Sequence, residues 1–260
     1  MNNIKEKILT AIVLGDGFFG KIRFLIYIFL FPLFRVFHIL VHAPCIRLKY
    51  NGIPFVFYPT DGSDVGILRD IFLKKEYAHT NVKPHVILDL GSNVGVAAMY
   101  FAIMFPNASI FCFEPDPDNF LKLKKNTEQF DSVHIFNVAV STHDGYVDFY
   151  SHKVNGMSSS VMNRGDGFHK ITTLSKTLDT IINNLPIQKV DLLKFDIEGA
   201  EFSVFKNFNS LHKVKHVIGE FHEDLSGESL NSFISLFKHF EVKENVRIQN
   251  KRYILYMNHV

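Results

Sequence analysis

The sequence has only two cysteines in 260 residues, Cys45 and Cys112. Cys112 lies in an apolar, strand-like run and Cys45 lies far from it in the chain, which argues against a disulfide framework and fits a reduced compartment. No group of Cys and His residues has the spacing of a structural zinc site. The sequence also lacks a concentrated basic patch with interleaved aromatic residues, so we expect no nucleic-acid partner.

The sequence has little net charge, but the charge is unevenly distributed. Residues 1–50 carry seven Lys and Arg residues against Glu6 and Asp16, whereas the remaining residues carry 21 basic and 24 acidic ones. Apolar residues make up 47% of the chain and 27 residues are Phe, which excludes a disordered protein. We expect one main domain preceded by a basic, apolar N-terminal arm over residues 1–45.

The arm contains the most apolar run, "FLIYIFLFPLF" (24–34), but the run is too short to span a bilayer, which takes about 20 residues. Extending it to Val41 includes Arg35, and no small-residue cleavage site follows the apolar stretch 8–14, as a signal peptide would require. Three interpretations remain: an arm in a membrane interface, a helix packed on the domain or on a second copy, or a true span.

Apolar runs and helical patterns alternate after residue 80, which predicts a doubly wound α/β sheet in a domain over 81–260. The near-continuous apolar content of the runs suits buried parallel strands. The predicted strands are 85–90, 109–115, 133–140, 190–199, 216–221, 241–248 and 252–258. The predicted helices are 94–104, 117–129, 177–184, 200–208 and 228–239.

Three further segments have distinct patterns. Residues 46–80 predict a hairpin with Asn51-Gly52 at its tip, followed by a helix. The turn signal at Asp144-Gly145 predicts an antiparallel strand over 144–152. Residues 153–170 have little periodicity and are interpreted as a mobile loop or lid.

The loop "GSNVG" (91–95) follows the first predicted strand of the domain, which ends at Asp89-Leu90. Glycines there allow a ligand to approach the main chain, and the following helix N-terminus carries partial positive charge. The dinucleotide pattern G-x-G-x-x-G is broken, because Asn93 replaces its second glycine and Val96 its third. This disfavours a nicotinamide-dependent oxidoreductase and leaves a ligand without a phosphate open.

The second predicted strand ends at Glu114. An acid at this position can accept two hydrogen bonds from a ribose diol. The ordinary alternative is a helix N-cap cluster, since Asp116 and Asp118 follow Pro115.

Five segments together resemble the FkbM-type S-adenosylmethionine-dependent methyltransferases over about residues 60–225. In order, they are "DLGSNVG", "CFEPDPDNFLKLKKN", "FNVAVS", "TLDTI" and "DLLKFDIEGAE". The resemblance implies a class I methyltransferase fold: a Rossmann-like, mostly parallel seven-stranded sheet with an antiparallel edge strand, here with a helical and hairpin N-terminal extension. It also implies S-adenosylmethionine as the cofactor.

The resemblance further implies which residues border the cofactor. The expected cofactor contacts are Asp89, Gly91, Ser92, Asn93, Gly95, Glu114, Pro115, Asn137, Val138, Ala139 and Asp196. Of these, Glu114 would bind the ribose, and residues 137–139 would lie against the adenine.

The motif "KFDIEGAE" supplies the catalytic candidates Lys194, Asp196 and Glu198, with His222 after the next strand. A buried Lys194 needs a carboxylate, and Asp196 is the expected partner or the general base. Glu201 is expected mainly as a helix N-terminal acid. His222 is a second candidate base, although a single His in a chain with 13 is more often incidental.

The predicted reaction is methyl transfer to a hydroxyl of a sugar, glycolipid, lipid-linked saccharide or related metabolite, with Asp196 or His222 as base. A metal bound by Asp196, Glu198 or Glu220 is possible but is not predicted. The competing interpretation is a non-catalytic binding protein recruited by its arm. We expect a cytoplasmic protein, with peripheral attachment to the cytoplasmic face of a membrane as an alternative, and the sequence leaves the oligomeric state open.

Overall fold

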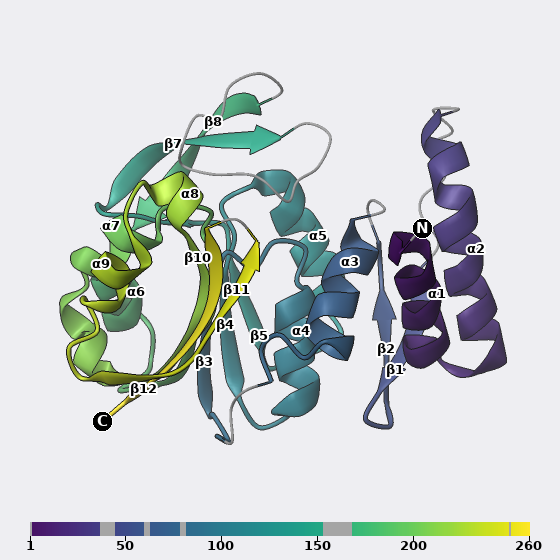
Figure 1. Ribbon diagram of the computed structural model, residues 1–260, viewed down its shortest axis with the longest axis horizontal. Coiled ribbons are helices and arrows are strands. Elements are labelled where there is room, and N and C mark those ends of the chain that lie inside the picture. The colour runs from purple at the N-terminus through teal and green to yellow at the C-terminus, as the bar shows by residue number, and fades with distance from the viewer. Residues whose placement is uncertain (1, 37–44, 60–62, 79–81, 153–167, 250) are drawn as a thin grey trace.

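The protein is described by a computed structural model that covers residues 2–36, 45–59, 63–78, 82–152, 168–249 and 251–260. A large sheet with helices against both faces forms the body (Figure 1). A smaller sheet lies at the top of this view. The N-terminal helices lie at the right, separated from the large sheet by a hairpin and other helices.

The large sheet has seven strands in the order β11-β12-β10-β9-β3-β4-β5. Their bounds are β3 (Val86–Leu90), β4 (Ser109–Phe113), β5 (Val133–Phe136), β9 (Val190–Phe195), β10 (Val214–His222), β11 (Phe240–Gln249) and β12 (Arg252–His259). The five strands from β5 to β10 pair in parallel, and β12 is antiparallel to both of its neighbours. This confirms the doubly wound, mostly parallel sheet, with its change in strand order between β3 and β9.

The antiparallel strand lies one position in from the edge, which corrects the prediction that it forms the edge itself. β11 and β12 form a hairpin through Lys251, whose φ is 59°. β11 carries charged residues along much of its length, and a charged strand is well suited to a sheet edge. The inner position goes to β12, whose buried residues are Ile254, Leu255, Tyr256 and Met257.

Successive strand residues pack into two separate cores, one on each face of the sheet. Ile87 and Leu192 pack with α4 (Val96–Met104) and α5 (Pro117–Thr127). Leu88 and Leu193 pack on the other face with α6 (Leu178–Asn184), α7 (Glu201–Lys206) and α9 (Leu230–Ile234). Both faces are therefore covered, as the unbroken apolar runs predict.

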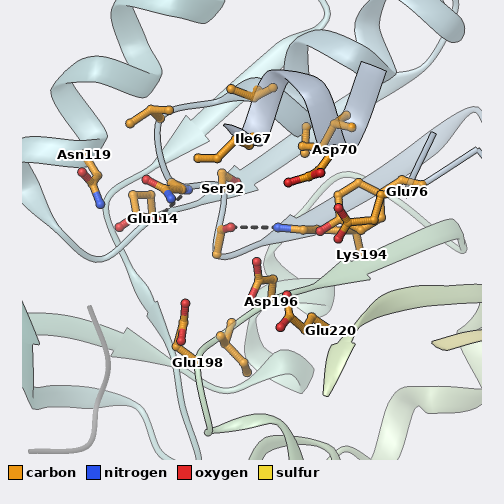
Figure 2. Close-up of a pocket in the computed structure, with 18 of the residues that line it drawn as sticks. Ile67, Asp70, Glu76, Ser92, Glu114, Asn119, Lys194, Asp196, Glu198 and Glu220 are labelled. Atoms are coloured by element: carbon orange, nitrogen blue, oxygen red, sulfur yellow. Dashed lines mark hydrogen bonds between the residues drawn. The ribbon is translucent and has the colours of Figure 1, made fainter. Parts of the chain in front are cut away.

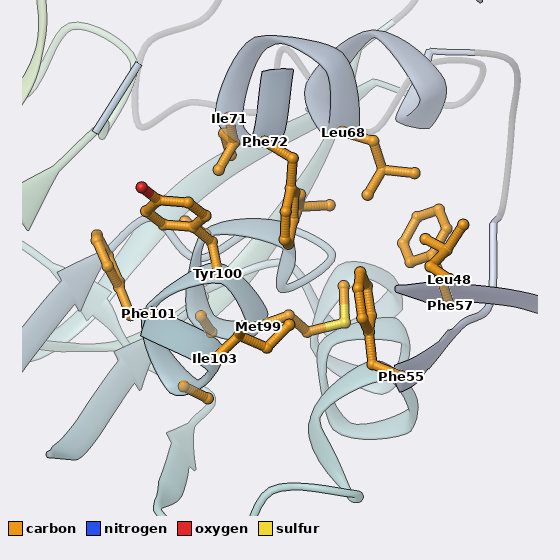
Figure 3. Close-up of a cluster of buried hydrophobic side chains, with 14 of the residues drawn as sticks. Leu48, Phe55, Phe57, Leu68, Ile71, Phe72, Met99, Tyr100, Phe101 and Ile103 are labelled. Atoms are coloured by element: carbon orange, nitrogen blue, oxygen red, sulfur yellow. The ribbon is translucent and has the colours of Figure 1, made fainter. Parts of the chain in front are cut away.

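The segment before the body forms the predicted hairpin and helix. β1 (Ile46–Tyr50) and β2 (Ile53–Phe57) meet at Asn51 and Gly52, both with positive φ. Next come α3 (Asp64–Leu68) and a π-helical turn, η1 (Arg69–Leu73). Phe72 of η1 stacks on Phe55 with ring centroids 5.4 Å apart and meets Tyr100 of α4 edge-on at 5.3 Å (Figure 3). Aromatic packing thus joins the hairpin to the body.

The N-terminal arm forms α1 (Asn2–Leu14) and α2 (Gly17–Val36). One side packs into the same core as the hairpin, through buried residues that include Ala11, Leu14, Phe24 and Tyr27. An ion pair between Glu6 and Arg69 adds a polar link to η1. Within the described part of the chain, no helix has both the length and the apolar character that crossing a membrane requires.

A second sheet has the order β6-β8-β7 and contains β6 (Ala139–Val140), β7 (Gly145–His152) and β8 (Phe168–Lys176). β7 and β8 pair antiparallel, as predicted for residues 144–152. Of the predicted loop 153–170, residues 153–167 lie outside the described residues, and residues 168–170 begin β8.

Several predicted elements differ in extent; the predicted strand 190–199, for example, ends at Phe195. The predicted strand 133–140 is divided between β5 and β6, because Asn137 turns the chain by donating its side-chain amide to the carbonyls of Glu114 and Pro115. The predicted helix 228–239 is shorter in the structure, where only α9 (Leu230–Ile234) is α-helical. The chain continues to Phe237 in turns whose hydrogen bonds join residues three positions apart. A short helix, α8 (Glu223–Ser226), precedes it, and a 3-10 turn (Asn209–Lys213) follows α7.

Candidate active site

A cavity of about 640 Å³ opens at the carboxyl ends of β3, β4, β9 and β10. This is where ligands bind in open α/β sheets, beside the point at which the strand order reverses. Figure 2 shows Ser92 and Glu114 on one side of the cavity and Asp196, Glu198 and Glu220 on another.

The two glycines of the loop pack closely against other parts of the protein. Gly91 has φ of 76°, and a Cβ at this position would overlap the backbone carbonyl of Asp196. Gly95 has φ of 90°, and a Cβ there would lie 2.9 Å from Leu123 Cδ1. The glycines were expected to admit a ligand, but the groups that approach them most closely are the protein's own. Gly91, Ser92 and Asn93 line the cavity, whereas Gly95 lies behind it.

Glu114 joins the end of β4 to this loop. Its Oε2 accepts the backbone N–H of Asn93 at 2.8 Å, and its Oε1 accepts that of Asp116 at 3.0 Å. The side chain is buried but lines the cavity. Burial raises the pKa of Glu114 to about 8, although the two N–H groups favour its charged form. Asp116 also caps α5 by accepting the backbone N–H groups of Asp118 and Asn119, as the N-cap alternative predicts.

Lys194 pairs with Asp89, and the prediction that its partner is Asp196 is wrong. Lys194 Nζ lies 2.9 Å from Asp89 Oδ1 and donates to the carbonyl of Gly91 at 2.8 Å. Parallel pairing of β3 with β9 sets Asp89 directly beside Lys194. Burial lowers the pKa of Lys194, but the carboxylates of Asp89 and Asp196 together outweigh this and raise it overall, so Lys194 stays charged. Lys194 lines the cavity, whereas Asp89 lies beneath it.

His222 is fully buried behind the acidic residues that line the cavity. Its Nδ1 lies 2.9 Å from Glu201 Oε1. Its Nε2 faces three carboxylates: Glu220 at 3.3 Å, Glu198 at 3.7 Å and Asp196 at 3.8 Å. Burial lowers the pKa of His222, but these neighbours, Glu201 first, raise it overall to about 11. A buried, protonated imidazole is poorly suited to be the base that the sequence suggests.

Glu201 begins α7, as predicted for a helix N-terminal acid, and its role extends beyond the cap. Both of its carboxylate oxygens accept the backbone N–H of Gly199, at 3.0 and 3.1 Å, and Oε1 also contacts His222. The chain reaches α7 through Glu198 and Gly199, with φ of 52° and 102°. This turn leaves the Glu198 side chain at the cavity wall.

Of the three residues expected against the adenine, one lines the cavity and two do not. Ala139 lines the cavity, together with Pro115 and Val140. Asn137 and Val138 are outside the lining, and Asn137 uses its amide to hold Glu114 and Pro115 in place.

Several cavity residues were missed by sequence reasoning because they lie far from the recognised motifs. Glu76 follows η1, and Arg252 begins β12. Burial, followed by the carboxylates of Glu220 and Asp196, raises the pKa of Glu76 to about 8. The signal for Glu76 was the charged run "KKEY" (74–77), at the end of the helix predicted within residues 46–80. We call Glu76, Asp196, Glu198 and Glu220 the acid wall of the cavity.

Comparisons with known proteins point to one family. Residues 89–253 match the Methyltransferase FkbM domain. The 2-O-methyltransferase NoeI of Sinorhizobium fredii is 29% identical over 178 residues, which are 60% of this chain and 72% of that protein. The hexuronic acid methyltransferase AglP of Haloferax volcanii is 28% identical over 158 residues, which are 58% of this chain and 61% of that protein.

Among solved structures, the crystal structure of methyltransferase FkbM from Methylobacillus flagellatus is similar over 98% of this chain and 59% of that chain. Its sequence identity is 12% and its TM-score is 0.47. The match to the family domain covers more than half of the chain. The chain therefore belongs to the FkbM methyltransferase family, and the protein is a methyltransferase.

Proposed function

We propose that this protein transfers a methyl group from S-adenosylmethionine to a hydroxyl of a sugar carried on a lipid or glycan. The observation that carries the cofactor assignment is Glu114. Each of its two carboxylate oxygens accepts one backbone N–H, and a carboxylate has about four lone-pair sites, so capacity remains for a ribose diol at the cavity. The sugar acceptor is supported by the relatives from Sinorhizobium and Haloferax, which are named as a 2-O-methyltransferase and a hexuronic acid methyltransferase.

The cavity lining offers groups of the kinds that would hold the cofactor. Glu114 and the loop from Gly91 to Asn93 would hold the ribose and the methionine end, and Ala139 and Val140 supply an apolar surface for the base. When bound, the cofactor supplies an activated methyl group on a sulfonium. The lack of a basic phosphate cradle in the "GSNVG" loop agrees with a ligand that has no pyrophosphate.

The acid wall would receive the acceptor hydroxyl. Asp196 has a buried Oδ1 with no hydrogen-bond partner within the described ranges, and the residue lines the cavity. We assign the acceptor proton to this wall, with Asp196 as the first candidate and Glu76 as the second. Glu76 is partly buried, and its pKa of about 8 lies near a physiological working pH, which is favourable for a general base.

The assignment is tested by titrating S-adenosylmethionine into the protein by calorimetry. We expect saturable binding, weakened at least tenfold by Glu114→Gln and retained by Asp196→Asn. Activity is then measured with labelled S-adenosylmethionine and a lipid-linked glycan extract, where Asp196→Asn should abolish turnover. Absence of binding by the parent protein would refute the cofactor assignment, and full activity of Asp196→Asn would remove Asp196 from the mechanism.

The lipid-borne acceptor is supported by the outward face of α1 and α2. This face presents large apolar side chains that are between 36% and 79% exposed: Leu9, Ile12, Val13, Phe18, Phe19, Ile22, Ile26, Phe29 and Leu30. Lys5 and Arg23 are also exposed on these helices. Apolar residues flanked by basic ones suit a surface of anionic lipids.

Vesicle binding tests this surface separately from catalysis. The parent protein should sediment with vesicles of anionic lipid, and the double substitution of Phe18 and Phe19 to Ser should release it. Leu121→Ser, at an exposed apolar residue of α5, is the matched control and should leave binding unchanged. If the parent stays in the supernatant, or forms dimers that the double substitution dissociates, the face is an interface with a second copy.

A further inference from the structure

We propose that Asp196, Glu198 and His222 form a binding site for one divalent transition-metal ion, of the class Mn²⁺, Fe²⁺ or Zn²⁺. Their ligand atoms all lie within 4.8 Å of one another. The site is argued from its donor atoms and the charges around them and does not rest on the proposed function.

The imidazole of His222 is oriented as a metal ligand would be. Glu201 accepts from Nδ1 at 2.9 Å and is itself fully buried, held by the backbone N–H of Gly199. This leaves Nε2 directed at the acid wall. Nε2 is buried and has no well-formed hydrogen bond within the part of the chain that the structure describes. A carboxylate that fixes one ring nitrogen while the other faces a group of acids is the usual support of a metal-bound histidine.

The distances around Nε2 match ligands that share one cation. Carboxylate oxygens of Glu220, Glu198 and Asp196 lie 3.3, 3.7 and 3.8 Å away. With bonds of about 2.1 Å, two ligands of one ion are about 3.0 Å apart at a right angle and about 4.2 Å apart across it. The Oδ1 atom of Asp196 that faces Nε2 is also buried without a hydrogen bond among the described residues. Small side-chain movements would bring these atoms onto one ion.

The charge balance also favours a cation. Four carboxylates surround His222, and within the described residues Arg252 reaches them, with its Nη1 3.8 Å from Glu220. Lys194 is engaged with Asp89. A divalent ion in place of the ring proton would bring one more positive charge to this group of carboxylates, which repel one another in a largely buried place.

The donor set indicates the class of metal. Mg²⁺ and Ca²⁺ prefer ligand shells of oxygen atoms only, whereas one imidazole with two or three carboxylates suits Mn²⁺, Fe²⁺ or Zn²⁺. Asp196, Glu198 and Glu220 line the cavity, so an ion at this site could also contact a ligand there.

The experiment titrates Mn²⁺ into the full chain after chelator treatment, followed by calorimetry and by electron paramagnetic resonance of the bound ion. We expect one site per chain. Glu198→Gln should weaken binding at least tenfold, and Glu201→Gln should weaken it by 10–100-fold through loss of ring orientation. Asp70→Asn, which changes another acid of the cavity lining, should bind Mn²⁺ like the parent.

Circular dichroism of each variant confirms that it folds, and Glu198→Gln is the safer of the two metal-site variants because its side chain is 18% exposed, whereas that of Glu201 is fully buried. Absence of saturable Mn²⁺ and Zn²⁺ binding by the parent would overturn the proposal, as would equal affinity in Glu198→Gln. S-adenosylmethionine is titrated into the same metal-free samples. Cofactor binding without Mn²⁺ or Zn²⁺ binding would refute the metal site alone, and the reverse result would refute the cofactor assignment alone.

Discussion

Lys194 Nζ and Asp89 Oδ1 form a buried ion pair of 2.9 Å beneath the glycine loop. The two residues come from neighbouring parallel strands at the same register position. The lysine also donates to the carbonyl of Gly91, so one charged group links the end of β3 to the loop that lines the cavity. Because both side chains are at most 3% exposed, removing either one leaves an uncompensated charge.

Lys194→Met should therefore lower the free energy of unfolding by about 3–5 kcal/mol. The double variant Asp89→Leu with Lys194→Met removes both charges and should be more stable than Lys194→Met alone. Chemical denaturation of the two single variants and the double variant completes the cycle. A double variant no more stable than Lys194→Met would show that the ion pair does not set the stability of this region.

Gly91→Ala should destabilise the protein, whereas the same substitution at a glycine in a helix should not. The new Cβ would overlap the Asp196 carbonyl, and the φ of 76° is unfavourable for alanine. Gly66→Ala in α3 is the matched control, since nothing lies within 4 Å of its Cβ position, and it should be neutral or stabilising by about 0.4–1 kcal/mol. Thermal unfolding compares the two. Equal melting temperatures would contradict the close packing of Gly91 on Asp196.

Glu114 should make the cofactor-free protein less stable as the pH rises. Its folded-state pKa of about 8 lies above the ordinary 4.5, so the folded protein binds the extra proton between these values. Stability is then full below about pH 4.5 and falls toward pH 8, by at most about 1.4 kcal/mol per pH unit for this group. Denaturation from pH 5 to 8 should give a smaller decline for Glu114→Gln than for the parent.

Asp179 is the control for this pH series, because the fold lowers its pKa, whereas it raises the pKa of Glu114. Burial raises its pKa, but hydrogen bonds from Ser210 and Asn209 outweigh this and lower it overall. The stability that it contributes is present above its unfolded pKa and is lost only in acid. Asp179→Asn should therefore keep the slope of the parent between pH 5 and 8. A Glu114→Gln slope equal to that of the parent would contradict the raised pKa.

The body of the fold was predictable from the sequence because its central strands, such as β3, are apolar on both faces. Ile87 and Leu88 are neighbours in sequence and pack into opposite cores, which requires helices on both sides of the sheet. The division of residues 133–140 was not predictable from composition, because it depends on hydrogen bonds from Asn137 to residues of another strand end.

The site residues that lie in short motifs directly after strands were predictable. The positions and partners that depend on how separate elements pack were not. Glu114 and the loop at 91–95 follow strands directly, so their common location follows from parallel pairing. The partner of Lys194 depends on the register between β3 and β9, which sequence spacing does not reveal. Glu76 reaches the cavity only because η1 packs on α4, an arrangement set by Phe72 and Tyr100.

Asn126 links the hairpin, α5 and the cofactor loop through one fully buried amide. Its Nδ2 donates to the carbonyl of Val94, and its Oδ1 accepts the backbone N–H of Tyr58, both at 2.8 Å. Asn126→Ala would leave these two backbone groups without partners, at a cost of about 1–3 kcal/mol each. Because Asn93 adjoins Val94 and donates to Glu114, affinity for S-adenosylmethionine should fall as well.

Gln129→Ala is the matched control for this last prediction. Gln129 also bonds the hairpin, through both the N–H and the carbonyl of Val56, but it is exposed, so water can replace it. Its loss should cost about 0.5–1.5 kcal/mol and leave cofactor affinity unchanged. Denaturation and calorimetry of both variants separate the outcomes. Equal losses in the two would mean that Asn126 contributes only an ordinary hydrogen bond to the hairpin and does not support the loop beside Glu114.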